Sequence, residues 1–388
     1  MSDFATINLP RILRVGGGAS RELVPTLRQL GLHRPLLITD PHMVACGYSG
    51  ALEQMLEAAG VVYGLFGECV PDPTTDSVDA ALERYRKGDF DSVVALGGGS
   101  SLDTAKAVAA LALRGGPMRD YKVPYPLDDG LPVVAIPTTA GTGSEVTRAA
   151  VITDSETGEK MLCMGLGLVP VAALVDYELT LSMPYRLSAD TGLDSLCHAL
   201  EAYVSRRSNP FTDSVALTAM RTIWRNIRTV CREPGNRPAR EAMMLAATQG
   251  GIAFANASVT LIHGMSRPLG ALFHVPHGLS NAMLLPEVTA WSLDHALSRY
   301  ADCARFMGVA AASDSDRVAA DKLVEGLRGL TSELSVPTPG AYGIDADAWT
   351  DALPLMAEQA LASGSPQNNP RVPDAGEIIA LYRRVWAA

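Results

Sequence analysis

Short apolar runs that alternate with helical segments in the first half of the chain restrict its fold more than any other feature. Strands are predicted at 35–39, 61–66, 92–96 and 132–136, with helical spacing at 21–30, 78–87 and 102–113 between them. Apolar strands separated by helices are typical of βαβ units, so we expect a parallel sheet with helices on both faces. Shorter strands at 149–152 and 172–175 are expected to complete this half.

The strand patterns stop beyond about residue 187. Helices are predicted at 188–205, 212–228, 240–256, 259–269, 279–291, 293–307, 315–330, 345–362 and 375–386. A chain of 388 residues is long enough for about two domains. We therefore expect a Rossmann-like α/β dinucleotide-binding domain over 1–186 and an all-α metal-binding and substrate domain over 187–388.

The charge balance argues against two classes of partner. The chain has 32 lysines and arginines against 42 aspartates and glutamates, a formal net charge of −10. Nucleic acid or an anionic membrane would need a basic face, so neither is expected as a partner. The longest uncharged stretch, 242–266, contains Gln, Asn and His and is too polar for a membrane span.

The N-terminus and the cysteines favour a cytoplasmic protein. The first six residues contain no basic segment followed by an apolar core, so no signal peptide is expected. The six cysteines are scattered and form no CxxC pair. We expect reduced, mostly buried thiols, as in a reducing compartment.

Two turns that follow consecutive predicted strands favour a phosphate site. Residues 97–101 read Gly-Gly-Gly-Ser-Ser and lead into a helix that contains Asp103 and Lys106. Glycines let a phosphate approach the backbone, and the first N–H groups of a helix point at it. Residues 137–145 follow the next strand and offer several hydroxyl donors. One such turn could be a simple tight connection, but two at the same sheet edge predict a ligand there.

Asp40 stands at the end of the first predicted strand. A carboxylate at this place can accept hydrogen bonds from a ribose diol and repels a 2′-phosphate, which favours NAD over NADP. An Asp before Pro41 could equally cap a turn or a helix.

The helical half contains a set of metal-ligand side chains. Asp194 and His198 are four residues apart and share one face of a predicted helix. His263, His274 and His277 lie in a largely apolar segment, so their imidazoles are expected to have buried partners. Each could be an ordinary hydrogen-bonded core residue. Together, a carboxylate and several imidazoles suit Fe(II), Zn(II) or another first-row divalent ion.

Four motifs in this order resemble the iron-containing (group III) alcohol dehydrogenases over nearly the whole chain. They lie at 97–106, 137–147, 191–201 and 263–278. The resemblance implies a dehydroquinate synthase-like architecture, with a Rossmann-like domain, a helical domain and an active site in the cleft between them. It also implies NAD(H), a divalent metal ion with Fe(II) favoured, and a homodimer or larger homo-oligomer.

The resemblance also implies site residues. The metal ligands would be Asp194, His198, His263 and His277. The cofactor contacts would be Asp40, Asp72, Gly98, Gly99, Ser100, Asp103, Thr138, Thr139, Thr142, Thr147, Lys160 and Leu179. Phe254 resembles a substrate-pocket residue of the family, although ordinary core packing would explain it equally well.

Three positions depart from the family pattern. Arg267 stands where many members have a histidine, and a guanidinium can bind a carboxylate or phosphonate of an anionic substrate in a bidentate way. A structural ion pair is the alternative for Arg267. His274 is then a candidate proton carrier. Asp72 replaces a common Asn, and an ionised carboxylate cannot donate a hydrogen bond, so the local contact must differ.

The expected function is interconversion of a small alcohol and its aldehyde or ketone by hydride transfer. The ion would act as a Lewis acid and the nicotinamide would carry the hydride. The alternatives are a sister-family reductase or glycerol dehydrogenase-like enzyme and, less favoured, a non-catalytic module that binds NAD and metal. The four ligand positions argue against the metal-free reductases.

Overall fold

The computed structural model describes residues 4–387 and divides the chain into two compact units. One unit spans Thr6–Met183 and the other begins at Pro184. The first unit is built on a parallel sheet and the second on helices alone, so the predicted fold class is confirmed.

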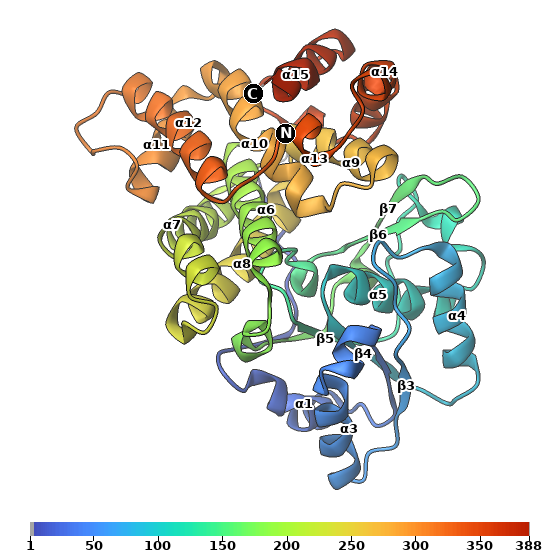
Figure 1. Ribbon diagram of the computed structural model, residues 1–388. Coiled ribbons are helices and arrows are strands. Elements are labelled where there is room, and N and C mark those ends of the chain that lie inside the picture. Colours follow the sequence, from blue (N-terminus) through green and yellow to red (C-terminus); the bar gives the residue numbers. More distant parts are fainter. Residues whose placement is uncertain (1–3, 388) are drawn as a thin grey trace. The chain divides into compact units, whose positions relative to one another are not determined.

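The first unit is organised by a six-stranded sheet whose order is β1-β8-β5-β4-β2-β3 (Figure 1). Its strands are β1 (Ile12–Val15), β2 (Pro35–Ile38), β3 (Gly64–Phe66), β4 (Ser92–Gly97), β5 (Val133–Pro137) and β8 (Ala172–Val175). Every neighbouring pair is parallel. β4 and β5 lie side by side in the middle, so their C-terminal turns meet at one edge of the sheet.

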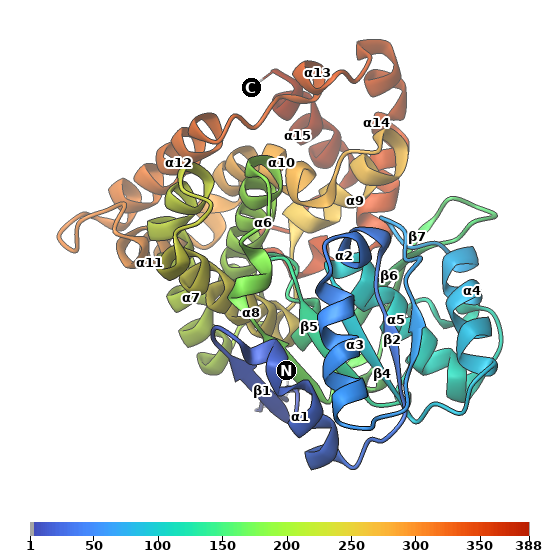
Figure 2. The ribbon, with the colours of Figure 1, turned by 60° about the horizontal axis from the view of Figure 1, so that its bottom comes forward.

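Alternate residues of the central strands bury into two separate cores. In β2, Leu36 and Ile38 join one apolar cluster, while Leu37 joins the other. The first cluster is covered by α4 (Thr75–Arg86) and α5 (Gly99–Arg114). The second is covered by α1 (Leu23–Leu30) and α3 (Tyr48–Ala58), and α3 crosses this face in Figure 2. A strand buried on both faces must be apolar at every position, which explains why these strands were predicted from apolar runs.

Shorter elements complete the first unit. The strands β6 (Ala149–Thr153) and β7 (Lys160–Met164) form an antiparallel hairpin. One short α-helix and five 3-10 turns connect the larger elements: η1 (Ala19–Glu22), α2 (Pro41–Ala45), η2 (Met118–Tyr121), η3 (Ser144–Val146), η4 (Leu166–Leu168) and η5 (Tyr177–Thr180).

The second unit consists of helices. The long ones are α6 (Tyr185–Val204), α7 (Pro210–Arg232), α8 (Arg237–Ala257), α9 (Leu261–Phe273), α10 (His277–Ser292), α11 (Leu297–Met307), α12 (Asp316–Glu333), α14 (Ala346–Ala362) and α15 (Ala375–Ala387). Short turns are η6 (Leu293–His295), α13 (Pro339–Tyr342) and η7 (Pro366–Asn368). No described helix alone is long and apolar enough to cross a bilayer; α8 and α9 pass that test only as a pair bent by 104°.

Helix α6 is the core of the second unit. It packs against α7, α8 and α10, and every residue from Ser188 to Val204 is buried. Three of these buried residues are Asp194, His198 and Glu201. Burying ionisable groups is costly unless each finds a partner, so this helix directs attention to what lies opposite them.

Candidate metal and cofactor sites

Four side chains from α6, α9 and α10 converge on one point. Asp194, His198, His263 and His277 each offer one ligand atom, and these atoms lie within 4.8 Å of one another. Asp194 Oδ1 is 3.9 Å from His198 Nε2, 3.5 Å from His263 Nε2 and 3.7 Å from His277 Nε2. The first three side chains are at most 5% exposed, whereas His277 is 43% exposed. All four predicted ligands therefore come together, with one side of the cluster open.

A glycine lets α10 approach α6 closely enough to bring His277 into the cluster. Gly278 follows this histidine, and a Cβ atom there would lie 2.5 Å from the backbone oxygen of Asp190. Only a residue without a side chain fits this contact. The imidazole of His277 is thereby held beside Asp194, one helical turn further along α6.

Glu201 fixes the orientation of one imidazole. Its carboxylate accepts hydrogen bonds from His263 Nδ1, from the Ile262 backbone N–H at 2.7 Å and from Thr260 Oγ1 at 2.7 Å. Because Nδ1 of His263 faces Glu201, Nε2 is the nitrogen that faces the other ligands, and it can bind a metal ion once it has lost its proton. Sequence reasoning missed Glu201, although it lies on the same face of α6 as Asp194, seven residues later.

Asn281 is a second residue that sequence reasoning missed. It lies one turn after His277 on α10, and its Nδ2 donates to Asp194 Oδ1 at 2.6 Å. The same nitrogen is 3.1 Å from His263 Nε2 and 3.3 Å from His277 Nε2. Asn281 Nδ2 therefore lies beside three of the four ligand atoms at once. Three imidazole nitrogens and one carboxylate oxygen arranged in this way fit a first-row divalent ion.

The electrostatics of the cluster also favour a cation. Burial lowers the pKa of His198 to about 3, so this imidazole is neutral at pH 7. Burial also acts to lower the pKa of His263, but Glu201 and Asp194 raise it to about 9. Two buried carboxylates thus hold a positive charge between them, and a metal ion can take the place of that proton.

Phe254 of α8 contacts a ligand directly. Its ring stacks on His198 with a centroid distance of 4.1 Å and an interplanar angle of 19°. The aromatic face therefore covers one side of the cluster. Contact with a substrate stays a prediction.

The remaining two predicted catalytic residues lie further along α9. Arg267 is partly buried and stands one turn after His263. His274 ends the helix in a left-handed conformation with φ 54° and is exposed. The group of four ligands does not include His274.

The turn after β4 has the shape expected of a phosphate-binding loop. Gly97 has φ 143°, and a Cβ there would lie 2.5 Å from Ser101 Oγ and 2.9 Å from Asp40 Oδ2. Gly98 caps α5 without a side chain. A Cβ on Gly98 or Gly99 would meet Thr139 Cγ2 at 3.4 Å or Thr142 Cγ2 at 3.0 Å. The two predicted turns therefore lie against each other.

A buried network fixes the second turn. Lys106 of α5 donates from Nζ to Ser144 Oγ at 2.8 Å, Thr147 Oγ1 at 3.0 Å and the Ala149 carbonyl at 2.9 Å. Asp103 accepts from Ser144 Oγ at 2.7 Å and from the Val151 N–H at 2.9 Å. The predicted cofactor residues Asp103 and Thr147 are thus bonded within the protein and join α5, the turn and the β6–β7 hairpin.

Asp40 is a helix cap. Its Oδ1 accepts from the backbone N–H groups of His42 and Met43, both at 3.0 Å. Its Oδ2 accepts from Ser101 Oγ at 3.0 Å. The carboxylate therefore stands beside the glycine-rich turn, and its contact with a ribose stays a prediction.

Asp72, Ser100 and Lys160 come together near the same turn. Asp72 Oδ1 forms an ion pair with Lys160 Nζ at 3.0 Å, and its backbone N–H donates to Ser100 Oγ at 3.3 Å. Asp72 has φ 49°, a left-handed conformation that Asn and Asp tolerate better than most residues. Asp72 is thus the ion-pair partner of a lysine, a role that an uncharged Asn could not fill.

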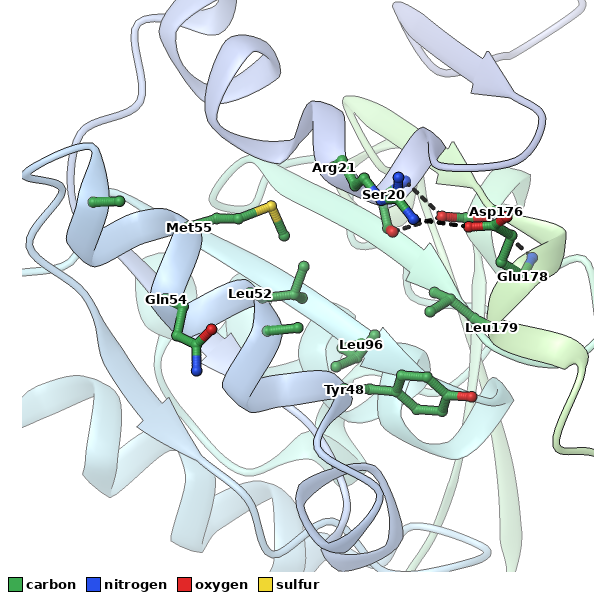
Figure 3. Close-up of a pocket in the computed structure, with 12 residues that line it drawn as sticks. Ser20, Arg21, Tyr48, Leu52, Gln54, Met55, Leu96, Asp176, Glu178 and Leu179 are labelled. Atoms are coloured by element: carbon green, nitrogen blue, oxygen red, sulfur yellow. Dashed lines mark hydrogen bonds and ion pairs between the residues drawn. The ribbon is translucent and has the colours of Figure 1, made fainter.

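A cavity of about 470 Å³ opens on the α1 and α3 face of the sheet (Figure 3). Apolar side chains of Leu52, Met55, Leu96 and Leu179 line it, and Ser20 stands at one side with its Oγ bonded to Asp176. Leu179 is the predicted cofactor residue among them. Leu96 lies two residues before Gly98, so the cavity begins beside the glycine-rich turn.

Comparisons with known proteins cover both units. A model described as iron-containing alcohol dehydrogenase matches residues 10–177, and one for the C-terminal part of the Fe-containing alcohol dehydrogenase family matches 188–386. NAD-dependent methanol dehydrogenase of Bacillus methanolicus is 33% identical over 97% of this chain and 98% of its own length. Lactaldehyde reductase of Escherichia coli (strain K12) is 33% identical over 96% of this chain and 97% of its own. A crystal structure of 1,3-propanediol oxidoreductase matches with a TM-score of 0.94 and 33% identity, over 98% of this chain and 100% of that chain.

Proposed function

Because this chain belongs to the iron-containing alcohol dehydrogenase family, whose members use NAD(H) and iron to interconvert alcohols and aldehydes, we propose that Asp194, His198, His263 and His277 form its catalytic metal site. The observation that carries this proposal is the convergence of four ligand atoms within 4.8 Å of one another. The hydrogen bond from His263 Nδ1 to Glu201 supports it, because carboxylate-oriented imidazoles are typical of metal sites.

The surrounding residues have distinct tasks in the proposed site. When bound, the ion supplies Lewis acidity and the nicotinamide ring exchanges the hydride. Glu201 keeps His263 in the ligating tautomer. Phe254 shields His198 from water by stacking on it. His277 stands at the exposed side of the ligand group, where a substrate would enter. His274 is exposed at the end of α9, the helix that carries His263, and is our candidate for passing a proton to solvent.

We propose that the two adjoining turns bind the pyrophosphate of NAD(H). Gly98, Gly99 and Ser100 open α5, whose unpaired N–H groups favour an anion. The hydroxyls of Thr138, Thr139 and Thr142 lie opposite or beside this turn and donate without adding charge. Asp40 would accept from a ribose and Lys160 would reach the other ribose. The apolar cavity beside Leu179 would take one of the two rings of the dinucleotide.

The substrate is an alcohol or aldehyde, and we propose a small one. The support is that similar proteins are named for methanol, lactaldehyde and 1,3-propanediol. A cytoplasmic location is supported by six free cysteines, five of them buried, which suits a reducing compartment.

A homo-oligomer is supported by the edge strand β1. Leu13 and Val15 on this strand are 41% and 43% exposed. An edge strand with exposed apolar side chains can pair with a second copy of the chain. Sedimentation equilibrium at micromolar concentration tests this, and a monomer would contradict it.

The proposed function is tested on protein purified without chelators. We expect about one metal ion per chain and consumption of NADH with small aldehydes, lost on chelation and restored by Fe(II) or Zn(II). His277→Ala should lose both metal and turnover, whereas His295→Ala, which changes a histidine outside the ligand group, should retain both. Turnover that survives complete removal of metal would contradict the proposal.

A further inference from the structure

Arg267 lies on the face of α9 that leads from the four proposed metal ligands towards solvent. His263, Arg267, Ala271 and His274 follow one another at helical spacing on this face. Their exposure rises along the helix, from buried His263 through partly buried Arg267 and Ala271 to exposed His274. Helical side chains lean towards the N-terminus, so the Arg267 side chain extends over the turn that carries His263.

No described residue pairs with the Arg267 guanidinium. Among residues 4–387, no carboxylate lies within 4.0 Å of it and no group accepts a hydrogen bond from it. Glu201 is the carboxylate whose charge acts on Arg267, yet both of its oxygens already accept hydrogen bonds from Thr260, Ile262 and His263. The structure therefore does not support a structural ion pair for this arginine.

This partly buried guanidinium, without a partner among the described residues, differs from Arg240, a buried arginine of the same unit. Arg240 is 2% exposed and donates to the Pro234 carbonyl at 3.0 Å and to Ser188 Oγ at 2.9 Å. Burial lowers the pKa of Arg267, but a guanidinium stays charged at any physiological pH. Because none of its nitrogens is both buried from solvent and unpaired, its donors are open to solvent and to a ligand.

With a divalent ion bound, the charges of the ion, the two buried carboxylates and Arg267 sum to one positive charge. Asp194 and Glu201 contribute two negative charges, which a divalent ion balances when the three imidazoles are neutral ligands. Arg267 adds one positive charge to this balance. A neutral alcohol would leave that charge uncompensated, whereas a substrate with one negative charge would neutralise it.

We propose that Arg267 binds an oxyanion carried by the substrate, which makes the preferred substrate a short aldehyde or alcohol with a carboxylate, sulfonate or phosphonate at its far end. This rests on the proposed function, because it assumes that the carbonyl group binds at the metal cluster. One α-helical turn separates His263 from Arg267, about 6 Å along the axis, so a chain of roughly two to four carbons spans the two. A planar guanidinium can bind any of the three oxyanions through two parallel hydrogen bonds.

Substrate selectivity is the first test. Metal-replete enzyme is assayed with NADH and three anionic aldehydes, namely succinic semialdehyde, sulfoacetaldehyde and phosphonoacetaldehyde, beside the neutral butanal and propanal. We expect Arg267→Gln to lower kcat/KM for the preferred anion about 10- to 150-fold, as expected for lost hydrogen bonds to a charged group, and to change the neutral aldehydes less than about threefold. Arg267→Lys should retain part of the preference, because it keeps the charge but not the fork. An equal effect on both classes would overturn the proposal.

Binding of unreactive anions is the second test and does not depend on turnover. Acetate, methanesulfonate and methylphosphonate are titrated into the holoenzyme with NADH by calorimetry, which distinguishes the three oxyanions. We expect the preferred anion to bind the native protein and to lose at least tenfold in affinity with Arg267→Gln. Arg328→Gln, which changes an exposed arginine paired with Glu287, should bind it like the native protein.

The two tests separate the two proposals. If no aldehyde of either class is reduced but the anion binds through Arg267, the proposed function fails and the oxyanion site stands. If neutral aldehydes are reduced and none of the three anions binds, the function stands and the oxyanion site is wrong. Metal content and circular dichroism of each variant show whether a loss reflects unfolding.

Discussion

At the scale of single residues, the most informative side chain is Glu201, which contacts the proposed metal ligand His263 but is not itself a proposed ligand. Glu201 accepts the proton of His263 Nδ1, and we expect Glu201→Gln to lower metal affinity about 10- to 100-fold, since the amide NH2 would then face Nδ1 and could not accept its hydrogen bond. The amide oxygen can still accept from Ile262 and Thr260, so the helices should stay folded. Titration of chelator-treated protein with Zn(II) measures the effect.

The matched control for this substitution is Glu287→Gln. Glu287 lies on α10 and pairs with an exposed arginine, so the same chemical change there should leave metal affinity unaltered. Equal affinity of the Glu201 variant and the native protein would show that the buried carboxylate has no part in holding the ion.

A second residue-scale prediction concerns pH. Burial lowers the pKa of Lys106 from its ordinary value of 10.5 to about 8, against the opposing charges of Asp103 and Glu145. Between pH 8 and 10.5 the unfolded chain therefore binds more protons at this lysine than the folded chain. Its contribution to the free energy of unfolding should rise with pH in that window, by at most about 1.4 kcal/mol per pH unit, and should be flat below pH 8.

Urea unfolding of native protein and Lys106→Met at several pH values measures this contribution as a difference. We expect the difference, native minus variant, to grow between pH 8 and 10.5. Lys122→Met changes an exposed lysine and should give a constant difference. A difference that shrinks as the pH rises would mean that Lys106 keeps its proton through its three acceptors.

The sequence predicted the clustering of the proposed metal ligands better than their surroundings, for a physical reason. Asp194 and His198 have the spacing of ligands on any helix, whatever the helix touches. Glu201 and Asn281 differ from ordinary polar residues only because they are buried opposite His263, and burial depends on packing between distant helices. The absence of a partner for Arg267 is likewise a property of the folded chain.

At the scale of secondary structure, the predictable elements are those buried on both faces. β2, β4 and β5 were predicted from continuous apolar runs, whereas β1 and β7 were missed. β1 alternates between exposed and half-buried residues at the edge of the sheet, and β7 alternates between half-buried and buried residues. β3 is confined to Gly64–Phe66, shorter than the predicted 61–66, because only its end pairs with β2.

The close contact of α10 with α6 at Gly278 allows a prediction about the stability of the protein and its metal binding. We expect Gly278→Ala to destabilise the protein by about 1–3 kcal/mol, because its Cβ would lie 2.5 Å from the Asp190 carbonyl and force the helices apart. The displacement should move His277 from Asp194 and weaken metal binding. Gly329→Ala is the control: apart from the adjoining residues and the nearby backbone of α12 itself, no atom lies within 4 Å of that Cβ, so we expect a gain of up to about 1 kcal/mol. Thermal unfolding and metal titration of both variants decide the matter, and a stable Gly278→Ala protein with native affinity would contradict it.

At the scale of the whole molecule, the residues proposed to bind the metal ion and those proposed to bind the pyrophosphate of NAD(H) belong to different units. The four proposed metal ligands come from α6, α9 and α10, whereas the proposed phosphate turns follow β4 and β5. The sequence suggests this division because the strand patterns end where the helical patterns continue. It could not predict which helices meet, since each is amphipathic or buried for reasons that do not specify a neighbour.

Hydrogen exchange can test this division directly. A ligand that binds only the folded state stabilises it by about 2.7 kcal/mol at 100 times its Kd, which slows exchange about 100-fold for amides exposed by openings that break the site. We therefore expect Zn(II) to protect α6, α9 and α10, and NADH to protect the turns after β4 and β5 and the start of α5. Helices α12 and α15 supply no metal ligand and act as internal controls for Zn(II). Protection by Zn(II) that is absent from α6, or equal in α12 and α6, would contradict the assignment, because Asp194 and His198 tie the ion to α6.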